Sequence, residues 1–97
     1  MQVRLHPAAR AELHEAAEWY ALRAGQRVAS DFVSAYDDVR SRIVEHPQIG
    51  TPGAAKTRKL RFRGFPYSLV YRLTEDHIAI IAIAHQRRRP EYWNARR

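Results

Sequence analysis

The sequence predicts a single α+β domain: an N-terminal strand, an antiparallel helical hairpin, and a three-stranded antiparallel meander that completes one twisted sheet. Three observations support this. Two long stretches in the first half repeat apolar residues at helical spacing, with only a tight turn between them. The second half is rich in strand-forming residues, much of it alternating between apolar and polar. A chain of 97 residues has room for one core, so we expect residues 1–97 to form one domain.

The N-terminal region predicts a short strand followed by a helix. Val3 and Leu5 alternate with polar neighbours, as in a strand with one buried face. Pro7 suits the first turn of a helix, where the amide hydrogen that proline lacks has no partner. We expect the helix over residues 8–24, with Gly25 directly after its end. Its apolar stripe consists of Ala9, Leu13, Ala16, Ala17 and Tyr20.

A second helix is expected over residues 27–45, because apolar residues again repeat on one face and Pro47 and Gly50 stop the pattern. A loop is expected over residues 47–55, which contain two prolines and two glycines. The apolar face of this helix consists of Val28, Phe32, Ala35, Tyr36, Val39 and Ile43.

Three strands are expected in the second half, over residues 59–62, 67–73 and 78–85, with a hairpin turn at residues 74–77. The last is apolar on both faces, which is typical of a central strand. We predict that Phe32, Val39 and Ile43 pack with Leu13 and Tyr20 against Leu69, Tyr71 and either Ile80 or Ile81.

The composition predicts a basic protein with acidic partners. The net charge is +7, carried mainly by arginine and concentrated in residues 56–63 and 87–97. Such a surface attracts an acidic protein, nucleic acid or the ribosome. Residues 86–97 are predicted to form a basic, aromatic C-terminal tail.

Several classes of protein are not expected. There is no cysteine, and the five histidines lack ligand spacing, so we expect no metal and no cofactor. The N-terminus lacks the apolar region of a signal peptide, and residues 78–84 form too short an apolar run to span a bilayer. A cytoplasmic protein that does not act on membranes is therefore expected.

Four stretches form a pattern when their order and spacing are taken together. The first helix opens with His6-Pro7-Ala8-Ala9 and then Glu12-Leu13, and it carries Glu18-Trp19-Tyr20 near its end. The second half contains FPYSLVY (residues 65–71) and IAHQRRRPEYW (residues 83–93). Over nearly the whole chain this pattern resembles the ParE branch of the ParE/RelE toxin superfamily.

The resemblance implies a helical hairpin packed on a twisted, mostly antiparallel sheet. It also implies a cognate antitoxin, acidic and partly disordered when free, encoded beside the toxin. Two targets are compatible with the superfamily. RelE-like members cut mRNA in the ribosome, whereas characterised ParE-like members inhibit DNA gyrase. Because the fold is compatible with both targets, the choice between them depends on the side chains of the site.

Two basic positions of the RelE-like site are lost here. RelE-like enzymes use basic residues and a C-terminal tyrosine to activate a 2′-hydroxyl, stabilise the phosphate and protonate the leaving oxygen. Aligned on residues 67–71, the strand arginine of that set falls on Ser68 and the arginine after the last strand falls on Gln86. A neutral hydroxyl does not replace a bidentate clamp on a phosphate, which argues against efficient RNA cleavage.

Three positions of the RelE-like site are kept. Lys59 and Arg61 match its earlier basic pair, and Tyr92 matches its tyrosine. Arg87 and Arg88 lie directly beside the lost arginine at position 86. If the chain is a nuclease, these five residues are its catalytic candidates.

Contact residues are predicted from the same resemblance and from charge. The candidate target surface consists of Lys59, Arg61, Arg63, Arg87, Arg88, Arg89, Tyr92 and Trp93. The candidate antitoxin contacts are Trp19, Tyr20, Arg61 and Arg63. Two alternatives stay open: Tyr92 and Trp93 pack the tail onto the sheet, and the basic residues of the strand form a solvated face.

Three functions follow as hypotheses. The first is a non-enzymatic toxin that binds gyrase through its basic C-terminal half. The second is a metal-independent endoribonuclease that acts on ribosome-bound mRNA. The third is a protein that has lost toxicity and binds only its antitoxin. Ser68 and Gln86 favour the first over the second, and nothing in the sequence excludes the third.

Overall fold

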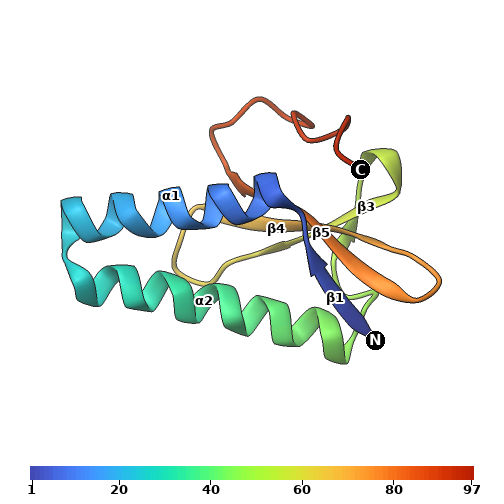
Figure 1. Ribbon diagram of the computed structural model, residues 1–97, viewed down its shortest axis with the longest axis horizontal. Helices are drawn as coiled ribbons and strands as arrows, with labels where there is room; N and C mark the ends of the chain where they lie inside the picture. The colour runs from blue at the N-terminus through green and yellow to red at the C-terminus, as the bar shows by residue number, and fades with distance from the viewer.

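The computed structural model describes residues 1–97, and its elements follow the predicted order of strand, two helices and meander (Figure 1). In chain order the helices and strands are β1 (Gln2–Leu5), α1 (Pro7–Ala24), α2 (Gln26–Glu45), β2 (Thr51–Pro52), β3 (Thr57–Arg61), β4 (Tyr67–Leu73) and β5 (His77–His85). The predicted α+β class is therefore confirmed, and both helices match their predicted ranges to within one residue at each end.

The sheet differs from the expectation in two respects. The loop predicted over residues 47–55 contains the two-residue strand β2, which pairs with β3 and gives the sheet five strands. Two residues are too few to produce a periodic pattern, so the prolines and glycines around them indicated only a loop. In addition, β1 pairs with β5 in parallel, whereas all other pairs are antiparallel.

The strand order β1-β5-β4-β3-β2 places β5 between two neighbours, so the prediction of a central strand is confirmed. Strand β1 pairs only with the first half of β5, from Gln2 opposite His77 to Leu5 opposite Ile80. Residues 81–85 of β5 therefore have a strand on one side only. Helix α1, which follows β1 after a single residue, lies near this open edge (Figure 1).

The two helices form the predicted antiparallel hairpin (Figure 1). The Nδ1 atom of His6 accepts a hydrogen bond from the Ala8 amide at 3.0 Å and caps α1 at its proline start. Gly25 alone connects the helices, and its φ of 96° belongs to the region that favours glycine. No helix of this chain combines the length and the apolar character that crossing a membrane requires.

The main core lies between the hairpin and one face of the sheet. Phe32, Val39 and Ile43 of α2 are each 0% exposed and contact the inner residues of the sheet. The predicted partners Leu13, Leu69, Tyr71 and Ile80 belong to the same cluster, with Tyr20 packed at its margin.

A second, smaller apolar cluster lies on the other face of the sheet. It consists of Val70, Ile81, Ala82, Ala84 and Trp93. Ile81 belongs here because the register between β4 and β5 shifts at Val70 and Tyr71, a bulge that turns one extra residue of β5 outward. Of the two isoleucines predicted as alternatives for the core, Ile80 is therefore the one that packs in the main core.

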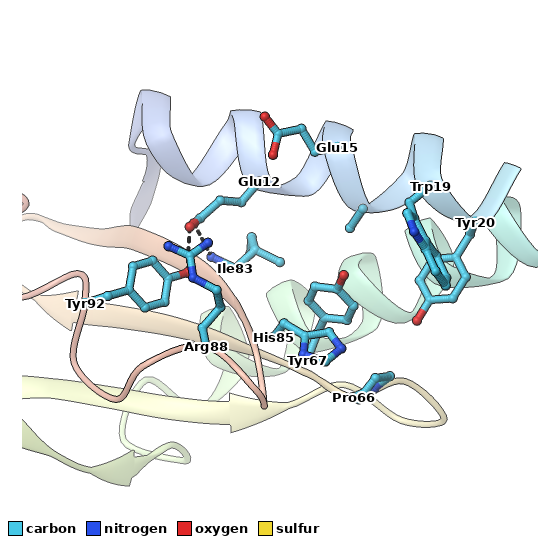
Figure 2. A pocket seen from close by; sticks show the side chains of 11 residues that line it. Glu12, Glu15, Trp19, Tyr20, Pro66, Tyr67, Ile83, His85, Arg88 and Tyr92 are labelled. Carbon is cyan, nitrogen blue, oxygen red and sulfur yellow. Dashed lines mark hydrogen bonds between the residues drawn. The ribbon is translucent and has the colours of Figure 1, made fainter. Parts of the chain in front are cut away.

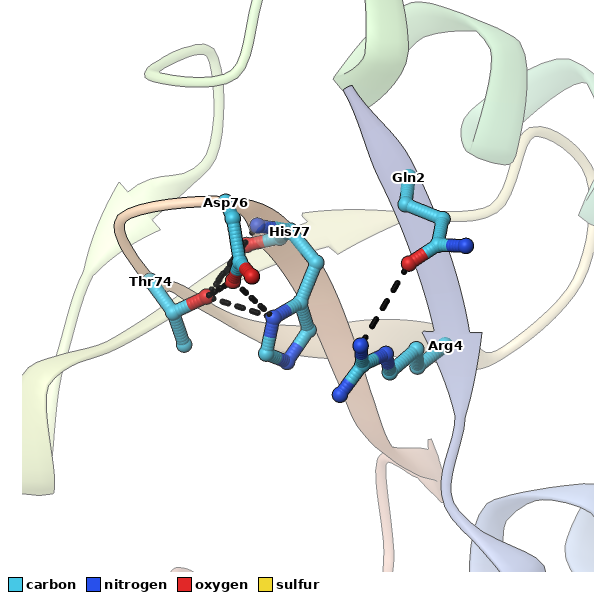
Figure 3. Close-up of polar contacts among 5 residues, drawn as sticks. All are labelled: Gln2, Arg4, Thr74, Asp76 and His77. Carbon is cyan, nitrogen blue, oxygen red and sulfur yellow. Dashed lines mark hydrogen bonds and ion pairs between the residues drawn. The ribbon is translucent and has the colours of Figure 1, made fainter.

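The hairpin turn between β4 and β5 is held by side chains in place of the glycine that such turns often use (Figure 3). The Thr74 hydroxyl accepts a hydrogen bond from the His77 amide at 3.2 Å, and the Thr74 amide donates to the His77 carbonyl at 3.0 Å. The His77 ring lies 2.8 Å from the Asp76 carboxylate, which steadies the exposed turn.

Candidate functional site

The C-terminal tail (residues 86–97) folds back over the sheet and is fastened by one carboxylate, that of Glu12 in α1 (Figures 1 and 2). The Tyr92 hydroxyl donates to Oε2 of Glu12 at 2.6 Å. The Arg96 guanidinium donates to both carboxylate oxygens, at 2.8 and 3.0 Å. We call Glu12, Tyr92 and Arg96 the tail clasp.

The tail clasp also occupies the open edge of β5. The Ile83 amide donates to Oε1 of Glu12 at 3.0 Å, and Arg96 donates to the Ile81 carbonyl at 2.9 Å. These are backbone groups on the half of β5 that β1 leaves without a partner strand. The side chains of the clasp therefore satisfy polar groups that an edge strand would otherwise leave unpaired.

Burial and hydrogen bonding set the charges in the tail clasp. Burial opposes the ionisation of Glu12, but hydrogen bonds from Arg96, Tyr92 and the Ile83 amide outweigh it, so the pKa of this carboxyl lies below its ordinary 4.5. Burial and the hydrogen bond to Glu12 together raise the pKa of the Tyr92 hydroxyl. At neutral pH the clasp thus holds a carboxylate, a guanidinium and a neutral phenol.

A groove runs along α1 beside the open edge of β5, and we call it the α1 groove (Figure 2). Its volume is about 610 Å³. Its apolar walls come from Ala16, Trp19, Tyr20, Pro66, Tyr67 and Ile83. Trp19 is 52% exposed, which is unusual for so large an apolar side chain and is typical of a surface that a partner covers.

A second cavity, the basic hollow, lies between the sheet and the tail and has a volume of about 730 Å³. Its polar and charged side chains include Lys59, Arg61, Ser68, Gln86, Arg88 and Tyr92. Arg61 donates a hydrogen bond to the Gln86 side-chain oxygen at 3.3 Å. Strands β3 and β4 and the tail therefore supply one surface with several free positive charges.

The two cavities share a wall, because His85, Arg88 and Tyr92 line both of them. The Arg88 guanidinium lies over the Tyr92 ring, 4.0 Å from its centroid. At that distance a cation–π contact stabilises both side chains. The tail thus separates the α1 groove from the basic hollow.

Comparison with known proteins decides the family. A family model described as the ParE toxin of the type II toxin–antitoxin system parDE matches residues 3–90. The chain belongs to this toxin family. The protein named Toxin ParE2, from two strains of Mycobacterium tuberculosis (CDC 1551 / Oshkosh and H37Rv), is 29% identical over 89 residues, which are 92% of this chain and 85% of that relative.

A solved structure described as a chromosomal ParDE TA system from P. aeruginosa shares the fold. It superposes with a TM-score of 0.67 at 20% sequence identity, and the match covers 88% of this chain and 95% of that one. The β-α-α-β-β-β arrangement is therefore common to this ParE-family toxin and the solved structure.

Within the ParE-family fold, the residues predicted for the target surface are only partly brought together. Trp93 is 7% exposed and packs in the second apolar cluster, as the packing alternative has it. Arg63 lies in the turn after β3, and Arg87 and Arg89 are exposed but line neither cavity. The predicted residues that do meet at the basic hollow are Lys59, Arg61, Arg88, Tyr92 and the mostly buried Trp93.

The residues predicted to contact an antitoxin lie in two places. Trp19 and Tyr20 line the α1 groove side by side (Figure 2). Arg61 lines the basic hollow instead, and Arg63 lies on the turn beyond it. These four residues therefore lie in two places on the surface, and their contact with an antitoxin stays a prediction.

Sequence reasoning missed the tail clasp. Glu12 entered only as part of a motif, and Arg96 was counted only as tail charge. A signal was nevertheless present: position 12 follows Ala9 by three residues and precedes Ala16 by four, so an acidic side chain stands on the apolar face of α1. Such a residue needs a partner, but its position does not reveal which of the many arginines supplies it.

Proposed function

We propose that this ParE-family toxin acts in the cytoplasm by binding and inhibiting DNA gyrase rather than by cutting RNA, and that an acidic antitoxin neutralises it. The observation that carries the choice of mechanism is the engagement of Tyr92. Its hydroxyl donates to the Glu12 carboxylate at 2.6 Å, and its pKa is raised. A tyrosine base must become a phenolate, and a tyrosine acid must reach the leaving oxygen. Both are disfavoured by this contact.

The charges of the basic hollow support the same choice. The positions where RelE-like enzymes carry guanidinium groups hold Ser68 and Gln86, which are neutral. Gln86 accepts a hydrogen bond from Arg61 and so occupies part of a remaining guanidinium. A binding surface needs only summed positive charge, whereas phosphate chemistry needs donors aimed at one oxygen.

The α1 groove supports an antitoxin-binding role. It offers an exposed tryptophan and an apolar floor, which together suit an amphipathic segment that folds on binding. The net charge of +7 favours association with an acidic chain.

A ribonuclease is the second candidate, and a specific observation favours it. Lys59, Arg61, Arg88 and Tyr92 line one cavity that is large enough to admit part of an RNA strand. The distinction between the two candidates therefore rests on chemistry rather than on shape.

Induction of the free toxin in cells separates the two mechanisms. We expect altered plasmid supercoiling with intact mRNA. Tyr92→Phe removes one hydrogen bond of the tail clasp but keeps the ring under Arg88 and the two Arg96–Glu12 hydrogen bonds, so a binding toxin should keep most of its toxicity. Loss of a catalytic hydroxyl would instead lower cleavage by about a hundredfold or more. Ser68→Arg restores a guanidinium and should help only a nuclease. Ribosome-dependent mRNA cleavage by the parent, abolished by Tyr92→Phe, would refute the proposal.

A further inference from the structure

The tail clasp lets a helix residue set the shape of a surface that it does not itself form. We propose that Glu12 is a positioning residue of this toxin, which holds the C-terminal tail so that Arg88 and Tyr92 wall the basic hollow. The inference rests on the proposed target surface and deepens it. Three features of the tail support this role. The tail has few other attachments to the domain, several of its polar groups bond to Glu12, and Tyr92 forms part of the wall of the basic hollow.

The tail has few attachments besides the clasp. Residues 86–91 are exposed, and Trp93 is the only tail residue that is buried. The Nε1 donor of Trp93 is buried without a hydrogen-bond partner, so packing alone holds the indole. At the start of the tail, Gln86 donates its amide to the Pro66 carbonyl at 2.9 Å and accepts from Arg61 at 3.3 Å. Beyond that first residue, one further polar contact to the sheet joins Arg72 of β4 to the Arg96 carbonyl at 2.8 Å. Fastening of the tail therefore depends strongly on Glu12.

Removal of the Glu12 charge leaves several polar groups without an acceptor. The carboxylate accepts from Tyr92, from two nitrogens of Arg96 and from the Ile83 amide. A glutamine in its place has one acceptor oxygen and turns donor hydrogens toward Arg96. The Arg96 guanidinium then keeps the Ile81 carbonyl but loses its carboxylate partner, and because the side chain is already 19% exposed, turning toward water becomes favourable.

Movement of Tyr92 changes the basic hollow. The Tyr92 ring supports the Arg88 guanidinium at 4.0 Å and the Arg96 guanidinium at 5.1 Å. Without that ring Arg88 loses its fixed place, and the wall between the hollow and the α1 groove is lost. Glu12 thus acts on the target surface through Tyr92 and Arg96.

Glu12 also lies in the lining of the α1 groove (Figure 2). A segment bound in that groove contacts the clasp from the side opposite to the hollow. If such a segment binds the docked and the released tail with different affinities, its binding and the position of the tail are coupled.

The experiment compares Glu12→Gln with Glu18→Gln, which removes the same charge from an exposed position on the same helix. Both are made in a Trp19→Phe background, so that Trp93 is the only tryptophan. We expect Glu12→Gln to shift Trp93 emission to longer wavelength and to speed tryptic cleavage within the tail by about tenfold or more, with cooperative melting retained. Glu18→Gln should change neither.

A pH titration gives a readout that general destabilisation does not produce. Below pH 4.5 the Trp93 emission of the parent should shift as Glu12 is protonated, in a range where far-UV circular dichroism still reports a folded protein. Glu12→Gln should lack this transition, and Glu18→Gln should keep it. Arg96→Gln removes the other half of the clasp and should release the tail equally, even if Glu12→Gln fails to fold. The double variant should add little to either single one.

Growth inhibition on induction, at matched protein levels, tests the positioning role. We expect Glu12→Gln to inhibit about tenfold less than the parent and Glu18→Gln to match it. A docked tail in both clasp variants, or a released tail with full growth inhibition, would overturn the inference while leaving the proposed function intact. Absence of growth inhibition and of altered supercoiling in the parent would overturn the proposed function, and this role with it.

Discussion

The centre of the core is Phe32, and its truncation should be among the most damaging single changes in the domain. Its ring is 0% exposed and lies 5.1–5.4 Å from the ring centroids of four aromatic neighbours, Tyr20, Phe62, Phe65 and Tyr67. Buried phenylalanine-to-alanine changes cost about 3–5 kcal/mol. The loss of two edge-on and two tilted aromatic contacts places Phe32→Ala toward the upper end of that range.

This loss of unfolding free energy is a large fraction of the total stability of a small domain, which is about 5–15 kcal/mol. Since about 1 kcal/mol shifts the Tm of a domain of this size by about 4–8 °C, we expect the Tm to fall by roughly 15–40 °C. Urea denaturation of the purified, antitoxin-free protein measures the change. Val33→Ala, the next residue of α2 and 40% exposed, is the matched control and should change the midpoint little. Equal midpoints for parent and Phe32→Ala would refute this account of the core.

Three further predictions concern the loop, the clasp and the partner. Gly50→Ala should destabilise by about 1–3 kcal/mol in thermal melts, because its Cβ would lie 2.7 Å from the Tyr71 hydroxyl oxygen and 2.9 Å from the Arg58 Cβ. An unchanged Tm would contradict this. The folded-state pKa of Glu12 lies below 4.5, so its stabilising contribution is complete above that pH and is lost as the pH falls through the folded pKa. Glu12→Gln should therefore flatten the acid limb of the stability curve, and an unaltered limb would count against the clasp. Association with the acidic antitoxin expected to be encoded beside the toxin should slow as salt rises, and a salt-independent on-rate would exclude electrostatic steering.

The fold could be predicted from the sequence wherever a pattern was long enough to repeat. Helix α2 shows this well, because Phe32, Val39 and Ile43 recur at helical spacing and are all buried. The strand β2 could not be predicted, since two residues, one of them proline, carry no periodicity. Nor could the outward turn of Ile81 be predicted, because a bulge changes which face a residue takes without changing composition.

The site could be predicted only as a surface. Charge and resemblance predicted that Lys59, Arg61 and Arg88 share one surface, and in the structure all three line the basic hollow. Neither indicated that Tyr92 would be bound by a residue 80 positions earlier in the chain. Long-range pairing of one acid with one of many arginines depends on tertiary geometry, and local spacing contains no information about it.

The case of Tyr92 bears on how toxins of one fold are assigned to different mechanisms. A tyrosine at the same position after the last strand can act as an acid or base, or it can only hold the tail in place. An alignment records a tyrosine in either case. What differs is the partner of the hydroxyl. A phenol aimed into an open cavity can exchange a proton with substrate, whereas one that donates to a half-buried carboxylate has its proton held and its pKa raised. The pairing of Tyr92 with Glu12, together with the neutral side chains of Ser68 and Gln86, therefore argues for binding over chemistry more strongly than any single aligned residue argues for cleavage.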